Sequence, residues 1–258
     1  MPGAQELLAR ALADPTLLDD AAANPEEYAD RYGLTPAEVR RFCGSGRPGV
    51  SLSADKTRAM KFLLADGAAP GTLALCRAVA DEDEIFTRCL LPAKMSSPAG
   101  LISAITRLGE LASRSAAAGD VPVIRDIVRY EVLPQEVRGN SVRPTTAPAV
   151  GPSLGADVRM AEFGCAVGQI RRRLIEKAAY EDLRERPTYY VVAHASVAPA
   201  RVLVHRVSRD LYRLLSLCDG SLPVHALAER LGAHTESVER ALARVRATGV
   251  DVAVARRA

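Results

Sequence analysis

The four histidines are the residues of this sequence best suited to catalysis or metal binding, because imidazole binds metals and transfers protons near neutral pH. They are His194, His205, His225 and His234. None is spaced as H-x-x-x-H or H-E-x-x-H, the patterns that place two imidazoles on one helix face. His194 and His205 fall in adjacent predicted strands and could be cross-strand neighbours, yet no carboxylate accompanies them there. We therefore expect no metal, no cofactor and no catalytic residue in this chain.

The acidic residues give no clearer catalytic signal. Asp126 and Glu131 lie five positions apart on one predicted helix, so they share a face poorly, and we expect them to pair with Arg125, Arg129 or a partner protein. The run "DEDE" at 81–84 favours an acidic helix start, which the helix dipole stabilises. The sequence contains neither G-x-G-x-x-G nor a P-loop.

The cysteines and the N-terminal residues indicate the cellular compartment in which we expect this protein. Five cysteines are scattered without a C-x-x-C pair, and buried free thiols are the interpretation for Cys76 and Cys218. No apolar run approaches the ~20 residues of a membrane span, and the N-terminus lacks the pattern of a secretory signal. We expect a cytoplasmic protein that does not contact membranes.

The charge is unevenly distributed along the chain. Residues 1–158 carry 17 basic and 20 acidic side chains, whereas residues 159–258 carry 17 basic and 11 acidic side chains, a net charge of +6. The basic C-terminal part points to an acidic partner.

The first 138 residues predict helices and no strand. Short helices occupy the first forty residues, "TPAEV" predicts a capping box from Thr35 to Glu38, and "FCGSGRPG" at 42–49 predicts a break in the chain. Four further helices are expected at Ser53–Ala65, Pro70–Leu91 (broken near Asp81), Pro98–Ala118 and Pro122–Arg138.

The pattern changes after a Pro- and Gly-rich stretch at 139–156, which we interpret as a linker. Strands are expected at Val158–Val167, Thr188–Ala195 and Arg201–Ser208, with a helical turn after the first of them. Three helices and a short final strand follow, and the first of those helices repeats apolar residues at i, i+3, i+4 and i+7. The fold class is α+β: a helical domain (1–138, with 1–43 as a candidate subdomain), the linker, and a winged-helix-like domain (157–258).

A winged helix raises the alternative of a DNA-binding transcriptional regulator. A recognition helix presents polar or basic side chains at its N-terminal end. Here that end carries Glu236 and Glu239, and carboxylates beside phosphates oppose the counterion release that drives binding. The sequence argues against nucleic acid as the ligand.

The stretch "RVLVHRVSRDLYRLLSLCDGSLPVHALAERLG" resembles the RiPP recognition element, the winged-helix module of the pyrroloquinoline-quinone peptide chaperone. The resemblance covers roughly Thr188–Val254. It implies binding of the leader of a ribosomally made, post-translationally modified peptide, in the groove between the third strand and the third helix of the module.

A second resemblance extends over the helical part. The helix "PVIRDIVRYEVLPQEV", followed by "VRMAEFGCAVGQIRRRL" and the module above, is similar to partner proteins of multinuclear non-heme iron-dependent oxidases of the methanobactin and thiaglutamate pathways. It implies a non-catalytic subunit of a hetero-oligomer that presents the precursor peptide, with the iron in the oxidase. The first forty residues instead resemble the small-subunit-like helical domain of extradiol ring-cleavage dioxygenases and the leaders of nitrogen-fixation-associated peptides. A dioxygenase small subunit is therefore a further alternative.

These resemblances assign candidate residues. The leader would pair with the edge of "RVLVHRV", its apolar side chains would contact Val202, Val204, Leu242 or Val245, and its carboxylates would meet Arg206, Arg240 and Arg244. The oxidase would dock on Ile124, Ile127, Val128 and Glu131. Ordinary core packing is the competing interpretation for both apolar sets.

Overall fold

The computed structural model describes residues 2–14, 16–139, 150–194 and 201–253 and is a mixed helical and antiparallel-sheet structure, which confirms the α+β class. The N-terminal half contains α1 (Pro2–Ala13), α2 (Leu17–Ala23), α3 (Pro25–Tyr32), α4 (Pro36–Ala68), α5 (Pro70–Arg77), α6 (Glu82–Ile85), the π-helical η1 (Phe86–Leu90), α7 (Pro98–Arg114) and α8 (Val121–Gly139). The remainder contains β1 (Ser153–Leu154), β2 (Arg159–Phe163), α9 (Val167–Ile175), the 3-10 turn η2 (Glu181–Leu183), β3 (Thr188–His194), β4 (Val202–Val207), α10 (Arg209–Ser216), α11 (Val224–Leu231), α12 (Thr235–Ala247) and β5 (Val252–Ala253). No described helix is long and apolar enough to span a membrane.

Helix α4 is one helix of 33 residues, so the predicted break at 42–49 is wrong. It begins with the predicted capping box: the Glu38 amide donates to Thr35 Oγ1 at 3.2 Å, and the Thr35 amide donates to the Glu38 carboxylate at 2.8 Å. Near its other end, Lys61 Nζ donates to three backbone carbonyls, those of Leu90, Leu91 and Ala93. The predicted break rests on Gly44, Gly46, Pro48 and Gly49, which cost ~1 kcal/mol per glycine and ~3 kcal/mol for the proline inside a helix. Contacts at both ends of α4 act against these costs.

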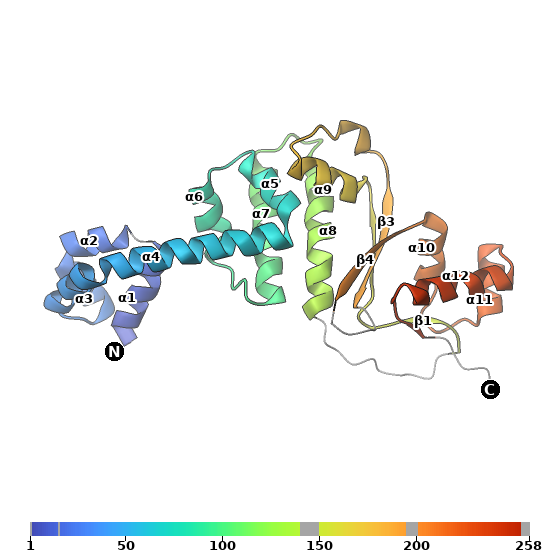
Figure 1. Ribbon diagram of the computed structural model, residues 1–258, viewed down its shortest axis with the longest axis horizontal. Helices are drawn as coiled ribbons and strands as arrows, with labels where there is room; N and C mark the ends of the chain where they lie inside the picture. The colour runs from blue at the N-terminus through green and yellow to red at the C-terminus, as the bar shows by residue number, and fades with distance from the viewer. Residues whose placement is uncertain (1, 15, 140–149, 195–200, 254–258) are drawn as a thin grey trace.

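Helix α4 also joins two separate cores (Figure 1). The first core lies among α1, α2, α3 and the start of α4, and includes Leu7, Tyr28 and Val39. The second lies among the end of α4 and helices α5 to α8, and includes Leu73 and Leu108. The N-terminal helices therefore stand apart from the rest of the chain, at the far end of α4.

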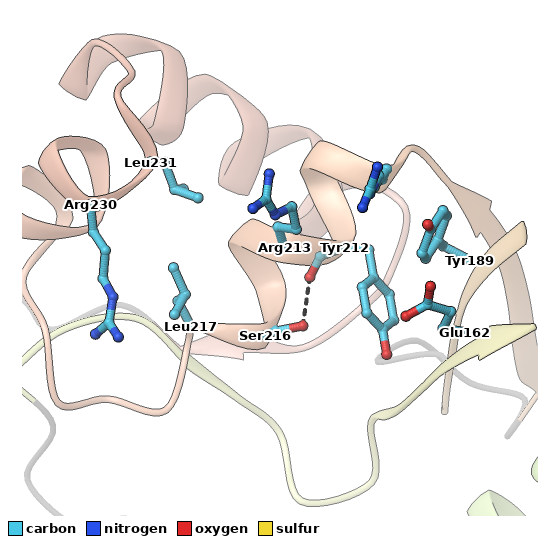
Figure 2. A pocket seen from close by; sticks show the side chains of 9 residues that line it. Glu162, Tyr189, Tyr212, Arg213, Ser216, Leu217, Arg230 and Leu231 are labelled. Atoms are coloured by element: carbon cyan, nitrogen blue, oxygen red, sulfur yellow. Dashed lines mark hydrogen bonds between the residues drawn. The ribbon is translucent and has the colours of Figure 1, made fainter. Parts of the chain in front are cut away.

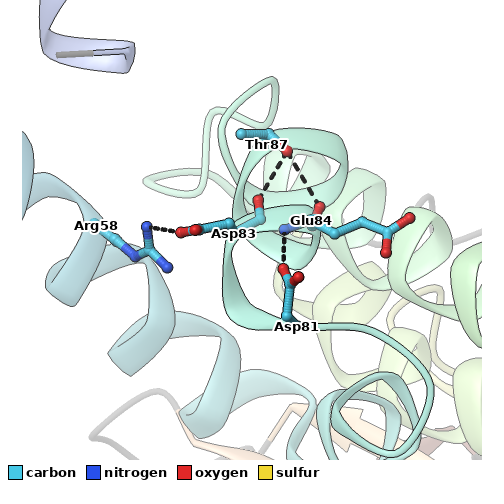
Figure 3. Close-up of polar contacts among 5 residues, drawn as sticks. All are labelled: Arg58, Asp81, Asp83, Glu84 and Thr87. Atoms are coloured by element: carbon cyan, nitrogen blue, oxygen red, sulfur yellow. Dashed lines mark hydrogen bonds and ion pairs between the residues drawn. The ribbon is translucent and has the colours of Figure 1, made fainter. Parts of the chain in front are cut away.

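The acidic run at 81–84 starts α6, as the sequence predicts (Figure 3). The Glu84 amide donates to the Asp81 carboxylate at 2.8 Å, which caps the helix. The neighbouring Asp83 pairs with Arg58 of α4 and so fixes α6 against the long helix. The predicted break near Asp81 is confirmed, because α5 ends at Arg77.

Strands β2, β3 and β4 form an antiparallel sheet in that order. Residues opposite each other in the register share a face, so the pairs Val192–Val204 and Tyr190–Arg206 face the same side. That side packs on α8 and α9, because Tyr190 and Val192 share a core with Ile127. The opposite side, with Val191, packs on helices α10 to α12. The sheet is the middle layer between two sets of helices.

This layering has a consequence for the predicted boundary at residue 138. Helix α8 belongs to the predicted helical domain, yet its residues Ile127 and Val137 share one continuous core with Phe163 and Ile170. The two predicted domains are packed together through α8.

Part of the predicted linker is structured; residues 140–149 of it lie outside the described residues. Strand β1 pairs with β5, and the amides of Val150 and Gly151 donate to the Gly220 carbonyl at 3.0 Å. A Cβ at Gly151 would lie 1.6 Å from the Leu222 carbonyl oxygen, so only glycine fits there. Residues 150–156 thus pack against the C-terminal helices.

Candidate functional site

Strand β4 is an outer strand of the sheet. In the described part of the chain it pairs with β3 alone, so its other edge carries backbone N–H and C=O groups without a strand partner. Val204, in the middle of β4, is 38% exposed, which is high for a valine in a strand. The strand β2 forms the opposite edge, but it is shorter and its Ala161 and Phe163 are fully buried. The edge of β4 is therefore the more accessible one.

The two faces of β4 differ in their surroundings. Val202, Val204 and Arg206 face the α8 side, and Val202 packs partly against the core there. Leu203, His205 and Val207 alternate with them and face the C-terminal helices. A Cβ placed at Gly249 would lie 3.0 Å from Leu203 Cδ1, so the start of β4 adjoins the turn that ends α12.

This geometry overturns the pocket expected from Val202, Val204, Leu242 and Val245. The two strand residues lie on one side of the sheet and the two helix residues on the other. Leu242 and Val245 are only 1% and 6% exposed and belong to the core of the C-terminal helices. The β4 residues that face α12 are Leu203 and His205 instead. The alternation of a strand separates 203 and 205 from 202 and 204, but it does not show which of the two pairs faces α12.

His205 carries an unpaired polar atom. Its Nε2 is buried and has no hydrogen-bond partner among the described residues. A buried polar atom without a partner costs roughly 1–3 kcal/mol.

The three arginines named from the sequence are all exposed but do not lie together. Arg206 projects from β4 on the α8 side, opposite Arg240 and Arg244 of α12. Arg240 Nε approaches the Glu236 carbonyl on its own helix at 3.3 Å. Arg244 lines a hollow of about 570 Å³ between α10 and α12, which we call the α10–α12 hollow; its other lining residues include Ser208, Asp210, Leu211, Leu214, Val238 and Ala241. Ser208 directly follows β4, so the end of the strand meets this hollow.

The docking face expected on α8 is wrong for Ile124, Ile127 and Glu131, because these residues are inside the protein. Ile124 and Ile127 are 4% and 0% exposed and belong to two cores, and Val128 packs on the first of these. Glu131 is 3% exposed. Ile124, Ile127 and Glu131 are therefore not accessible to a separate subunit, whereas Val128 is only half-buried.

Glu131 has a structural role. Its carboxylate accepts hydrogen bonds from the amides of Gly71 and Thr72 at 2.8 and 2.9 Å and from Thr72 Oγ1 at 2.7 Å. Arg171 Nε of α9 donates to it at 2.8 Å. Glu131 therefore connects α5, α8 and α9; Asp126 instead accepts from the Gly164 amide. Neither residue pairs with Arg125 or Arg129 in the contacts described.

The two strand histidines do not form a pair. The register places His194 opposite Val202 and His205 opposite Val191, so the imidazoles face opposite sides of the sheet. His194 Nε2 lies 2.8 Å from the Val137 carbonyl of α8. Among the residues that the structure describes, no group of three or more His, Cys, Asp or Glu side chains is placed to hold a metal ion.

The cysteines are buried free thiols, as the sequence predicts for Cys76 and Cys218. Burial raises the pKa of Cys76 and Cys165 to about 12 and that of Cys89 and Cys218 to about 11. Because the thiolate is the reactive form, these thiols are poor nucleophiles at neutral pH.

Comparison with known proteins adds no information about this site. No protein-family model matches the chain, and no curated protein matches it in sequence.

Proposed function

We propose that this chain is a non-catalytic accessory protein that binds the leader of a ribosomally made precursor peptide along the outer edge of β4. In this proposal β2–β4 and α10–α12 form a winged-helix-like recognition element. The observation that carries it is the outer edge of β4, which has no strand partner among the described residues and carries the exposed Val204. An extended peptide that adds to such an edge gains main-chain hydrogen bonds, and pockets for its alternate side chains give specificity.

The chain would present this peptide to a separate multinuclear iron-dependent oxidase in the cytoplasm. The resemblance of the α8 and α9 segments to partner proteins of such oxidases supports this part of the proposal. The iron would belong to the oxidase. The oxidase would bind a surface other than the buried residues of α8.

A DNA-binding role receives less support from the same helices. Glu236 lies in the first turn of α12 and is exposed, as is Glu239. A helix that enters a major groove with carboxylates at its N-terminal end meets phosphate repulsion.

Hydrogen exchange of the full chain tests the proposal. The probe is the synthetic leader of a short peptide encoded beside the gene for this chain. Its binding should slow amide exchange in Val202–Val207 and leave exchange in α1–α3 unchanged, because only the β4 edge gains hydrogen bonds.

A pair of variants tests the same surface by affinity. Val204→Asp should weaken peptide binding about tenfold or more, because it places a charge on the strand edge that contacts the peptide. Leu63→Asp is the matched control, since Leu63 is 69% exposed on α4, which packs on α5, η1 and α7 rather than on the sheet. Equal affinity of both variants, or protection that avoids β4, would refute the proposal.

A further inference from the structure

The exposed face of α10 carries a row of polar side chains beside the end of β4. Ser208 caps the helix by accepting from the Leu211 amide at 3.2 Å, which fixes the direction of α10 after the strand. Arg209, Tyr212, Arg213 and Ser216 then follow at i, i+3, i+4 and i+7, so they share one face. Two hollows lie on either side of Arg213, and Leu231 of α11 also lines both.

The first hollow has a volume of about 490 Å³ and is rich in arginine and tyrosine (Figure 2). We call it the Arg–Tyr hollow; its charged and aromatic residues are Arg209, Arg213, Arg230, Glu162, Tyr189 and Tyr212. The rings of Tyr189 and Tyr212 contact each other, with their centroids 5.1 Å apart. Figure 2 shows these rings beside Glu162, and it shows Leu217 and Leu231 between Arg213 and Arg230.

In the described part of the chain, no carboxylate lies within ion-pair distance of the arginines of this hollow. Arg230 has a more distant acidic neighbour in Asp219, whose pKa is lowered by hydrogen bonds from Ser221 and by the charge of Arg230. None of Arg209, Arg213 and Arg230 forms an ion pair or side-chain hydrogen bond with another residue in the described ranges. The lining of this hollow therefore contains three guanidinium groups and one carboxylate, that of Glu162. Guanidinium groups without a carboxylate at ion-pair distance are free to bind carboxylates of a ligand, because their planar N–H donors match two carboxylate oxygens.

The α10–α12 hollow on the other side of Arg213 is more apolar. Leu211, Leu214, Val238 and Ala241 line it, together with Arg213, Arg244 and the single carboxylate of Asp210. Its volume lies within the ~300–1,000 Å³ range of small-ligand pockets, so it accommodates an apolar side chain of a peptide.

From this arrangement we infer that the peptide ligand carries an apolar residue flanked by acidic residues. The apolar side chain occupies the α10–α12 hollow, and the neighbouring carboxylates bind Arg213, Arg244 and the arginines of the Arg–Tyr hollow. A chain that leaves the β4 edge at Val207 meets Ser208 and Asp210 first, so this surface continues the edge. The inference rests on the proposed peptide binding and names the chemistry of the peptide.

The apolar lining distinguishes this ligand from a nucleic acid. A phosphate backbone satisfies arginines but offers no aliphatic side chain to Leu211, Leu214 and Val238. An acidic and apolar peptide satisfies both parts of the surface.

Selection from a displayed library of random 16-residue peptides against the full chain tests the inference. Binders should be enriched in Asp and Glu within a few positions of a Leu, Ile or Phe residue. For the best binder, fluorescence anisotropy should show that Arg213→Glu weakens binding at least tenfold. Arg172→Glu is the matched control, since Arg172 is exposed on α9, across the sheet from α10, and changes the net charge equally; it should change affinity less than twofold.

The outcomes separate this inference from the proposed function. Binders that protect the β4 amides from exchange, but show no acidic enrichment and no greater effect of Arg213→Glu than of Arg172→Glu, would overturn the inference alone. A library without any binder that protects β4 would overturn both. A labelled DNA duplex that loses binding in Arg213→Glu, while selected peptides do not, would assign the arginines to nucleic acid and also overturn the inference.

Discussion

Replacement of Glu131 should strongly destabilise the protein, because this carboxylate is buried and accepts four hydrogen bonds from two other helices. Glu131→Ala leaves the Gly71 and Thr72 amides, at the start of α5, without an acceptor. It also leaves Arg171 without its carboxylate. Removing one partner of a buried ion pair costs about 3–5 kcal/mol, and we expect Glu131→Ala to fall in that range.

The structure also predicts how much stability each related variant loses relative to Glu131→Ala. Glu131→Gln keeps one acceptor oxygen but turns an amide donor toward other donors, so about 2–3 kcal/mol is expected. Arg171→Met should cost less than either, because the Arg171 side chain is 31% exposed and the carboxylate keeps its hydrogen bonds to α5. The control is Glu27→Gln, which removes an exposed pair with Arg31 and should cost ~0.5 kcal/mol or less.

Urea denaturation followed by circular dichroism measures these differences, and equal m-values would show that the same surface unfolds in each variant. A loss of less than about 1 kcal/mol for Glu131→Ala, similar to Glu27→Gln, would refute the reasoning. It would also reopen a role for Glu131 in binding a partner.

Three further predictions concern packing, capping and pH. Gly109→Ala should destabilise the protein by about 1–3 kcal/mol, because the new Cβ would lie 2.3 Å from Val128 Cγ2 on α8, and Val128→Ala should restore most of the loss in a double-mutant cycle. Thr35→Ala removes the capping box of α4 and should cost about 1 kcal/mol, measured by thermal unfolding, whereas no change would show that the cap is redundant. Burial raises the pKa of the Cys76 thiol from an ordinary value of 9.0 to about 12. Its contribution to stability is therefore complete below pH 9 and declines by ~1.4 kcal/mol per pH unit between pH 9 and 12; urea denaturation over this range should show a shallower decline for Cys76→Ala, and parallel curves would contradict the shifted pKa.

Local sequence patterns were sufficient where local forces determine the structure. The strands β3 and β4 lie within a few residues of their predicted ranges, and the three predicted helices follow them as α10 to α12. Val- and Tyr-rich runs and i, i+3, i+4 spacing reflect burial directly. The capping boxes and acidic starts at Thr35 and Asp81 are equally local. The stretch at 42–49 predicts a break because of its own glycines and proline, whereas the contacts that stabilise α4 lie at its two ends, outside any short window.

The candidate site was less predictable, because it depends on which face of each element is covered. The sequence "VLVHRV" has no strict alternation, so it does not show whether Val202 or Leu203 faces α12. Ile124 and Ile127 form an apolar pattern that suits a docking face and a core equally well. The burial of Glu131 depends on Gly71 and Arg171, which lie 60 and 40 positions away in the sequence.

The length of α4 limits what a single ligand can reach. At ~1.5 Å per residue, its 33 residues extend over about 50 Å, and the sheet lies beyond its C-terminal end (Figure 1). An extended peptide advances ~3.3 Å per residue, so about 15 residues are needed to run the length of this helix alone. If a precursor binds β4 as proposed, a binding segment of fewer residues than this leaves the N-terminal helices free for a different molecule. A precursor with a longer segment can engage both ends, and its second contact then forms at an effective concentration set by the intervening chain.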